Sequence, residues 1–207
     1  MRKRILCFGD SNTWGYIPET GERYTEEIRW TGILEKELGD SFRVIEEGLN
    51  GRTTVFSDLM EPERCGITHL LPVILSQLPL DYMIVMLGTN DAKSHFHVNA
   101  TEIGYGMEEV ILKIRHILYV RNSAAKVVLV SPVPIKEAED AMFDEESAGK
   151  TRELASIYRA IAEQWGCLFF DAGSVVKEPG EDGIHMTENG HRMLGEALAE
   201  FVREQEK

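Results

Sequence analysis

Short apolar runs alternate along the chain with longer segments in which apolar residues recur at helical spacing. We expect five strands, at Arg4–Phe8, Phe42–Glu46, Tyr82–Leu87, Val127–Val130 and Cys167–Phe170. Strands that alternate with helices are typical of an α/β fold with a parallel sheet. The pattern therefore predicts a three-layer α/β/α fold with the flavodoxin-like strand order 2-1-3-4-5.

Apolar residues spaced three and four apart predict the helices between these strands. We expect helices at about Trp30–Leu38, Leu70–Leu78, Met107–Leu118, Leu154–Trp165 and Thr187–Glu204. Pro72 is compatible with a helix only in its first turn, and the charged segment Lys136–Lys150 is interpreted as an exposed insertion. Because no internal repeat or interdomain linker separates these elements, we expect one domain over residues 1–207.

The charge of the chain limits the partners that it can bind. Lys and Arg number 22 and Asp and Glu number 35, which gives a net charge of −13. Such a chain has no excess of cations to neutralise nucleic-acid phosphates or an anionic membrane surface. No apolar run reaches the roughly 18 residues of a membrane span, and the run after Arg2-Lys3-Arg4 is too short for a signal peptide. We expect a cytoplasmic protein that binds neither nucleic acid nor membrane.

The three cysteines, Cys7, Cys65 and Cys167, give no indication of a metal or a disulfide. Their number is odd and no two have the CxxC spacing. Cys7 and Cys167 also fall in strands that are not neighbours in the expected order. Free cysteines in apolar strands behave as small hydrophobic residues, so we expect reduced, unreactive thiols.

Polar loops follow the apolar strands at the points where the strands end. Gly9–Asn12, Gly48–Thr54 and Gly88–Asp91 are three such loops, and Asp182–His185 is a fourth, before the last helix. Right-handed crossovers place the strand-to-helix loops at one edge of a parallel sheet, and ligands bind beyond the carboxyl ends of the strands. We therefore expect the four loops to form one site.

The residue types in these loops suit acyl transfer. This reaction needs a nucleophile, a base, a group that orients the base, and donors for the developing oxyanion. Ser11 can act as the nucleophile and His185 as the base, with Asp182 orienting the imidazole from the same short loop. The main-chain N–H groups of Ser11 and Gly51 and the side-chain amide of Asn90 are candidate oxyanion donors.

These residues lie in blocks that resemble a known family, the SGNH (GDSL-type) hydrolases. The blocks are Phe8-Gly9-Asp10-Ser11, the loop around Gly51, Gly88-Thr89-Asn90-Asp91 and Asp182-Gly183-Ile184-His185. FGDSNTWG, VIEEGLNGRTT and MLGTND are similar to segments of the bacterial arylesterase and acyltransferase branch. The resemblance implies an SGNH fold and a serine esterase that cleaves short-chain acyl esters through an acyl-serine intermediate, with acyltransferase activity as a further expectation.

The resemblance implies the same triad, Ser11, His185 and Asp182, and the same oxyanion donors. It implies a small-molecule ester as partner, no cofactor or metal, and, by analogy, a homo-oligomer. One departure is Asn12, which stands where the namesake motif has leucine. The candidate pocket residues are Asn12, Trp14 and Ile184, and an apolar mouth is expected from Trp14, Ile17, Phe56, Ile184 and Met186.

Other conspicuous residues have simpler structural interpretations. Asp10 suits a carboxylate that stabilises a turn, and Asp171 suits a loop cap. A metal site built on paired histidines lacks further ligands at a recognisable spacing. His95 and His97 are therefore expected to be solvated loop residues, and His69 and His116 to be surface or satisfied core residues, whereas His191 falls in the final helix.

Several functions stay open beside the leading one. A carbohydrate O-acetyl esterase or a thioesterase of the same fold would use the same loops. A non-catalytic flavodoxin-like domain could bind a phosphate or flavin at Gly9–Thr13, although no GxGxxG or Walker pattern follows the first strand. An α/β-hydrolase is disfavoured because Thr13 stands where its GxSxG motif requires glycine.

Overall fold

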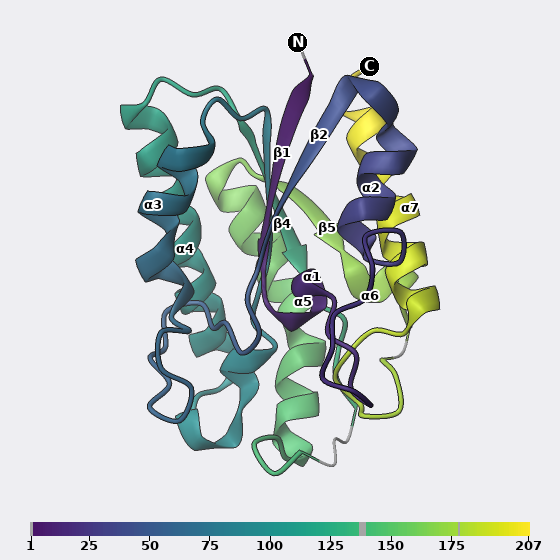
Figure 1. The fold of residues 1–207 in the computed structure, drawn as a ribbon. Coiled ribbons are helices and arrows are strands. Elements are labelled where there is room, and N and C mark those ends of the chain that lie inside the picture. Colours follow the sequence, from purple (N-terminus) through teal and green to yellow (C-terminus); the bar gives the residue numbers. More distant parts are fainter. Residues whose placement is uncertain (1, 137–139, 178) are drawn as a thin grey trace.

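The computed structural model describes residues 2–136, 140–177 and 179–207. Its centre is a five-stranded sheet in the order β2-β1-β3-β4-β5, in which every neighbouring pair is parallel (Figure 1). The strands are Lys3–Gly9 (β1), Phe42–Gly48 (β2), Tyr82–Met86 (β3), Lys126–Ser131 (β4) and Leu168–Asp171 (β5). This confirms the predicted fold class and strand order, and the strand ends differ from the predicted ones by at most two residues.

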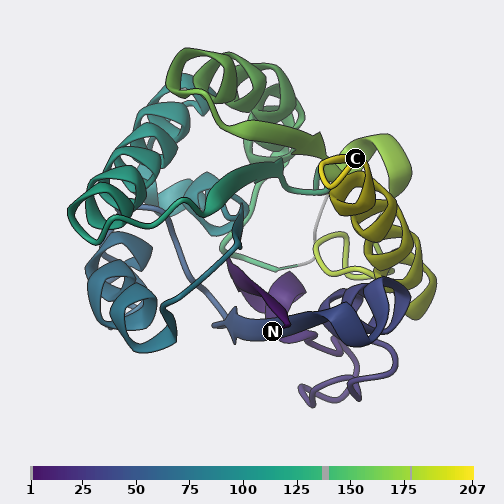
Figure 2. The ribbon, with the colours of Figure 1, turned by 90° about the horizontal axis from the view of Figure 1, so that it is seen from above.

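Helices cover both faces of the sheet (Figure 2). The helices α3, α4 and α5 pack on one face, and α2, α6 and α7 pack on the other. The α-helices are Ser11–Trp14 (α1), Trp30–Leu38 (α2), Gly66–Gln77 (α3), Ala100–Val120 (α4), Glu145–Trp165 (α5), Ala172–Val175 (α6) and Glu188–Glu204 (α7). Three short 3₁₀ helices are Gly39–Ser41 (η1), Asn90–Ala92 (η2) and Ser94–Phe96 (η3).

The apolar run of β1 is buried on both sides, and this accounts for its composition. Successive side chains of a strand point to opposite faces of the sheet. Leu6 and Phe8 pack in the core beneath α3, α4 and α5, whereas Ile5 and Cys7 pack in the core beneath α2 and α7. All four side chains have 0% exposure. A strand covered by helices on both faces has apolar residues at every position.

Three helices, α3, α4 and α5, begin earlier than the apolar spacing predicts, and polar residues cap the last two. Asn99 and Asp144 each form a capping box at the start of α4 and α5. The expectation that Pro72 lies in a first turn is wrong, because α3 begins at Gly66 and Pro72 falls inside it. The carbonyl four residues earlier belongs to Thr68, which is exposed, so water can satisfy it in place of the missing N–H.

The expectation of an exposed insertion at Lys136–Lys150 is wrong for its second half. The last six residues of this segment, Glu145–Lys150, belong to α5. Phe143 and Ser147 are buried. The Ser147 hydroxyl donates a hydrogen bond to the Ala92 carbonyl at 2.7 Å, which attaches the start of α5 to the segment after β3. Residues 137–139 of the predicted insertion lie outside the described residues.

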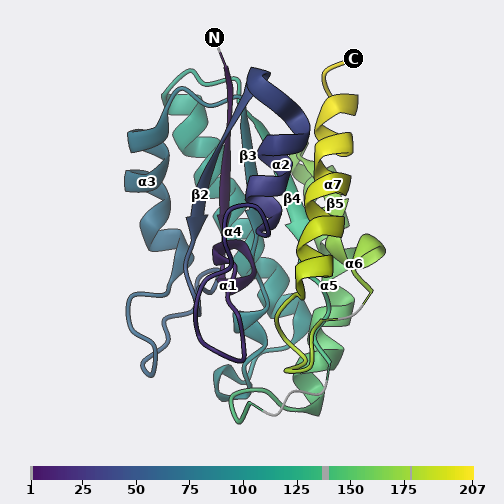
Figure 3. The same ribbon diagram turned by 45° about the vertical axis from the view of Figure 1, so that its right-hand side comes forward.

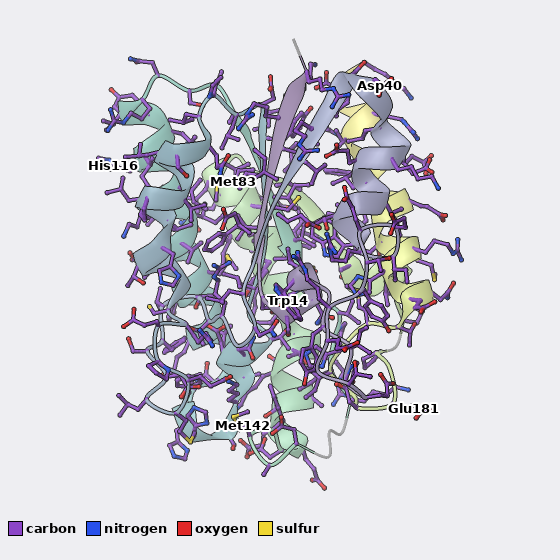
Figure 4. All side chains as sticks on the ribbon, viewed as in Figure 1. Trp14, Asp40, Met83, His116, Met142 and Glu181 are labelled. Atoms are coloured by element: carbon purple, nitrogen blue, oxygen red, sulfur yellow. The ribbon has the colours of Figure 1, made fainter. Side chains whose placement is uncertain are left out.

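The carboxyl ends of the strands meet at one edge of the sheet, opposite both chain termini (Figures 1 and 3). At this edge Gly9 of β1 is aligned with Gly48 of β2 and Met86 of β3. Figure 4 marks the edge with Met142 and the opposite edge with Asp40. In the described part of the chain, no helix has the length and apolar character needed to cross a bilayer.

Candidate active site

Ser11 lies in the tight turn that follows β1. The Asp10 carboxylate accepts a hydrogen bond from the Asn12 N–H at 3.0 Å and caps α1, so that Ser11 is the first residue of this short helix. The turn requires glycine at position 9, because a Cβ there would overlap the Thr13 side chain. The turn therefore presents Ser11 at the carboxyl edge of the sheet.

The imidazole of His185 joins Ser11 to Asp182. His185 Nε2 lies 2.9 Å from Ser11 Oγ, and His185 Nδ1 lies 2.5 Å from Asp182 Oδ2. The other carboxylate oxygen, Asp182 Oδ1, accepts the main-chain N–H groups of Ile184 and His185, each at 3.0 Å. The carboxylate thereby fixes both the ring and the loop that carries it.

The charge of Asp182 is stabilised where it lies. Burial would raise the pKa of this carboxyl, but hydrogen bonds from the His185 ring and from two main-chain N–H groups outweigh burial and lower the pKa. Asp182 is therefore ionised at neutral pH. A carboxylate on one ring nitrogen favours the tautomer whose other nitrogen can accept the Ser11 proton.

Asn12 holds the histidine loop against α1. Its side-chain oxygen accepts the Met186 N–H at 2.9 Å, and its amide donates to the Ile184 carbonyl at 3.4 Å. These two bonds flank His185 and connect residues 172 and 174 positions apart. Asn12 is 5% exposed, so its side chain is committed to positioning this loop.

Gly51 and Asn90 come from two further loops at the same edge. Gly51 has φ of 75°, a left-handed conformation that favours glycine. The Glu61 carboxylate lies so close that a Cβ on Gly51 would stand 2.8 Å from it. The Asn90 amide donates to the Arg52 carbonyl at 3.1 Å, which ties the two loops together.

Two main-chain donors at this edge of the sheet, those of Ser11 and Gly51, have no acceptor. Within the described residues, neither the Ser11 N–H nor the Gly51 N–H makes a hydrogen bond. The first N–H groups of a helix have no intrahelical acceptor, which explains the free donor of Ser11. Free N–H groups beside a nucleophile are suited to bind a developing oxyanion.

A cavity of about 510 Å³ opens at this edge. Six of the predicted site residues line it: Ser11, Gly51, Asn90, Asp182, Ile184 and His185. The structure therefore brings the candidate triad and all three candidate oxyanion donors into one cavity. Tyr16 also lines the cavity, and the centroids of the Tyr16 and His185 rings are 4.6 Å apart.

The predicted pocket residues are only partly at the cavity. Ile184 lines it, whereas Asn12 and Trp14 are not among its lining residues. The Trp14 ring lies instead beside the Arg23 guanidinium, 5.4 Å away. The expectation of an apolar mouth is wrong. Charged residues line the cavity, and four of the five residues expected there do not: Trp14, Ile17, Phe56 and Met186.

Arg52 is a buried positioning residue that the motif comparison did not single out. Its guanidinium donates to the Gly9 carbonyl at 2.8 Å and to the Glu47 carbonyl, and it lies 4.0 Å from the Phe8 ring centroid. Burial lowers the pKa of Arg52 to about 10, which leaves the group charged at neutral pH. No local pattern in the sequence identifies such a residue, because its partners come from two strand ends.

Two further buried groups hold the Asn90 segment in place. Asp91 accepts the N–H of Thr54 at 3.0 Å and also accepts its hydroxyl. Lys93, with a side chain 1% exposed, pairs with Asp58 at 3.3 Å and with Glu61. The segment after β3 is thus attached through Asn90 and Asp91 to the Gly51 loop and through Lys93 to the residues that follow this loop.

The other candidate residues have structural roles. Asp171 accepts the Gly173 N–H and the Ser131 hydroxyl and caps α6. His116 is exposed on α4 (Figure 4), and His95 lies 3.2 Å from Asp58. Among the described residues, no group of three or more His, Cys, Asp and Glu side chains is arranged to hold a metal ion.

Comparison with known proteins identifies the family. A model described as the GDSL-like Lipase/Acylhydrolase family matches residues 7–193. The chain belongs to this family. The finding confirms the resemblance that the four sequence blocks predict.

Several members of the family are similar over the whole chain. The aryl esterase of M. smegmatis is 44% identical with a TM-score of 0.92, over 98% of this chain and 99% of that chain. Est24, a carbohydrate acetylesterase from Sinorhizobium meliloti, is 38% identical with a TM-score of 0.93, over 99% and 100%. An acetylxylan esterase of Xylanibacter ruminicola is 24% identical over 221 residues, and the chain spans only 43% of its length. Because the chain belongs to this family and its relatives are esterases, the protein is a carboxylic ester hydrolase. The non-catalytic alternative is therefore set aside.

The buried His191 predicts how the stability of the esterase depends on pH. Its Nδ1 accepts the Trp30 N–H at 3.4 Å, and burial, with the nearby charges of His185 and Arg29, lowers its pKa from 6.5 to about 4. Between these values the unfolded chain takes up a proton that the folded chain resists. The contribution of His191 to stability is therefore present above pH 6.5 and lost as the pH falls toward 4.

We expect a His191→Asn variant, which keeps an acceptor but cannot titrate, to lose this dependence. Urea unfolding of both proteins at several pH values in this window measures the difference. The free energy of unfolding of the wild type, relative to the variant, should fall by roughly 1.4 kcal/mol per pH unit. Parallel curves for the two proteins would show that His191 does not control this dependence.

Proposed function

We propose that the enzyme cleaves short-chain acyl esters through an acyl-Ser11 intermediate. The observation that carries the proposal is the hydrogen-bonded series Ser11, His185 and Asp182, with distances of 2.9 and 2.5 Å between successive side chains. A serine hydroxyl is a weak nucleophile by itself and gains reactivity from an adjacent oriented base. This arrangement supplies that base.

In the proposed reaction, His185 Nε2 takes the Ser11 proton as Oγ attacks the ester carbonyl. The tetrahedral intermediate that forms carries a negative oxygen, which the Ser11 N–H, the Gly51 N–H and the Asn90 amide would bind. His185 then gives the proton to the departing alcohol oxygen, and the acyl group stays on Ser11. Water, activated by the same histidine, attacks the acyl-enzyme and releases the acid.

The character of the cavity supports a polar substrate and hydrolysis as the main outcome. Its wall includes the charged side chains of Glu61, Arg64, Lys93 and Asp140. Transfer to an alcohol requires exclusion of water from the acyl-enzyme, and a charged wall retains water. We propose that hydrolysis predominates over acyl transfer.

A carbohydrate acetylesterase is the second candidate function. The polar wall of the cavity favours a hydroxylated alcohol over a purely apolar one, and the similar Est24 carries that description. Both candidates use the same triad and differ only in the alcohol that leaves. A small acyl group, such as acetyl, is common to both.

The remaining expectations concern the setting in which the enzyme works. We propose a cytoplasmic enzyme, since its three cysteines are free and burial raises the pKa of the Cys7 and Cys167 thiols, which keeps them protonated. We also propose a homo-oligomer. Leu59 and Met60, which are 95% and 61% exposed, would offer apolar contact surface.

A Ser11→Ala variant tests the nucleophile. We expect kcat on p-nitrophenyl acetate to fall by about 10⁴- to 10⁶-fold, because the triad acts as a unit. Ser174, exposed on α6, offers a matched control, and Ser174→Ala should keep full activity. Unchanged turnover in Ser11→Ala would overturn the assignment.

An Asn90→Ala variant tests the oxyanion hole. Loss of one donor to the oxyanion should lower kcat by roughly 10²- to 10³-fold with little change in KM. The urea unfolding midpoint of the same protein separates this effect from structural damage, because the Asn90 amide also bonds to Arg52. A large loss of stability without a specific loss of kcat would make Asn90 a structural residue.

A further inference from the structure

Arg64 is a cation in the wall of the active-site cavity, and its main chain is hydrogen-bonded to the Gly51 loop. The Arg64 carbonyl accepts the Thr53 N–H at 3.1 Å. The next residue, Cys65, forms an isolated bridge with Thr53. Thr53 is two residues from Gly51, so the base of the arginine side chain is held close to the donors that would bind the oxyanion.

The Arg64 guanidinium has no partner of its own. Within the described residues, its side chain makes no hydrogen bond and no ion pair, and its Nε is buried without an acceptor. Lys93, the other cation of the cavity wall, differs in this respect, because Asp58 and Glu61 neutralise it. An unpaired arginine is notable in a chain with 35 acidic and 22 basic residues.

The carboxylates of the cavity wall are engaged elsewhere. Glu61 pairs with Lys93, and Asp182 binds the His185 ring. Asp140 accepts the Met142 N–H at 2.8 Å. Arg64 and Ser11 line the same cavity, and none of these carboxylates is paired with the Arg64 guanidinium.

We propose that Arg64 binds an oxyanion group, a carboxylate or a phosphate, carried by the ester substrate. A guanidinium presents parallel N–H donors that match the two oxygens of such a group. Within the described residues no side chain pairs with the positive charge of Arg64, and an anionic substrate in the cavity would supply the missing counter-charge. The inference rests on the proposed ester hydrolysis and specifies its substrate class.

The anionic group belongs to the alcohol part of the substrate. The acetyl group common to both candidate functions has no position for a second charged group, so in an acetyl ester the charge lies on the alcohol. Hydrolysis then releases acetate from the acyl side and an alcohol that carries the anionic group. The substrate class is therefore short-chain acyl esters of carboxylate- or phosphate-bearing alcohols.

Two matched esters test this inference. Para-acetoxybenzoate and its methyl ester share the scissile acetyl group and differ in the charge of the distant substituent. The ratio of kcat/KM for the charged ester to that for the neutral ester is compared between the wild type and Arg64→Gln. Intrinsic differences between the two leaving groups are the same in both proteins and cancel in this comparison.

We expect the ratio to fall by at least about tenfold in Arg64→Gln, mainly through KM of the charged ester. Arg64→Lys should retain part of the preference, because it keeps the charge but not the paired donors. Arg121→Gln, at an exposed position after α4, should leave the ratio unchanged. Para-acetoxyphenyl phosphate extends the comparison, and a larger Arg64-dependent preference for it than for the benzoate would identify phosphate as the preferred group.

An equal ratio in the wild type and Arg64→Gln, with the neutral ester still hydrolysed in a Ser11-dependent manner, would overturn the inference and leave the proposed function standing. Hydrolysis of neither ester by the wild type would contradict the proposed function itself. The rate on the neutral ester also reports whether Arg64→Gln is folded. The two failures are therefore distinguishable in one set of measurements.

Discussion

A buried arginine connects the strand ends on which the active site is built. Arg52 donates to the carbonyls of Gly9 and Glu47, which lie at the ends of β1 and β2, and its own carbonyl accepts the Asn90 amide. Buried carbonyls need hydrogen-bond partners; the guanidinium donates to both of these, and the Gly9 carbonyl also accepts the Leu49 N–H at 3.1 Å. The Arg52 side chain thus connects the serine turn to the end of β2, and its main-chain carbonyl connects the Gly51 loop to the Asn90 segment.

Asp10 and Asp91 are two further buried carboxyl groups at this edge of the sheet. Burial raises the pKa of Asp10 to about 6, against the Asn12 hydrogen bond and the charges of His185 and Arg52, which lower it. Burial likewise raises the pKa of Asp91 to about 6. Hydrogen bonds to buried charged groups are strong and directional. Burying these charged groups is unfavourable in itself, but their hydrogen bonds hold three loops in fixed positions at this edge of the sheet.

The fold and the candidate triad could be predicted from local signals. A strand such as Tyr82–Met86 is apolar at every position because helices cover both of its faces, and parallel topology gathers the loops that follow such strands. The role of Asn12 could not be predicted, since its partner Met186 is 174 residues away. Which residues line the cavity could not be predicted either. An apolar loop residue such as Phe56 can face the core or the site without any change in the local sequence pattern. The charged first turn of α5 resembles a solvated loop until its Asp144 cap is recognised.

The central claim, that His185 and Asp182 activate Ser11 as a nucleophile, is tested most directly by covalent labelling with an aryl phosphonate ester. The reagent phosphonylates an activated serine and releases a phenol, so intact-mass measurement counts the labelled residues and peptide mapping locates them. We predict one phosphonyl group per chain, on Ser11, and labelling slowed by orders of magnitude in a folded His185→Gln variant. A label on another residue, or an undiminished rate in that variant, would contradict the claim.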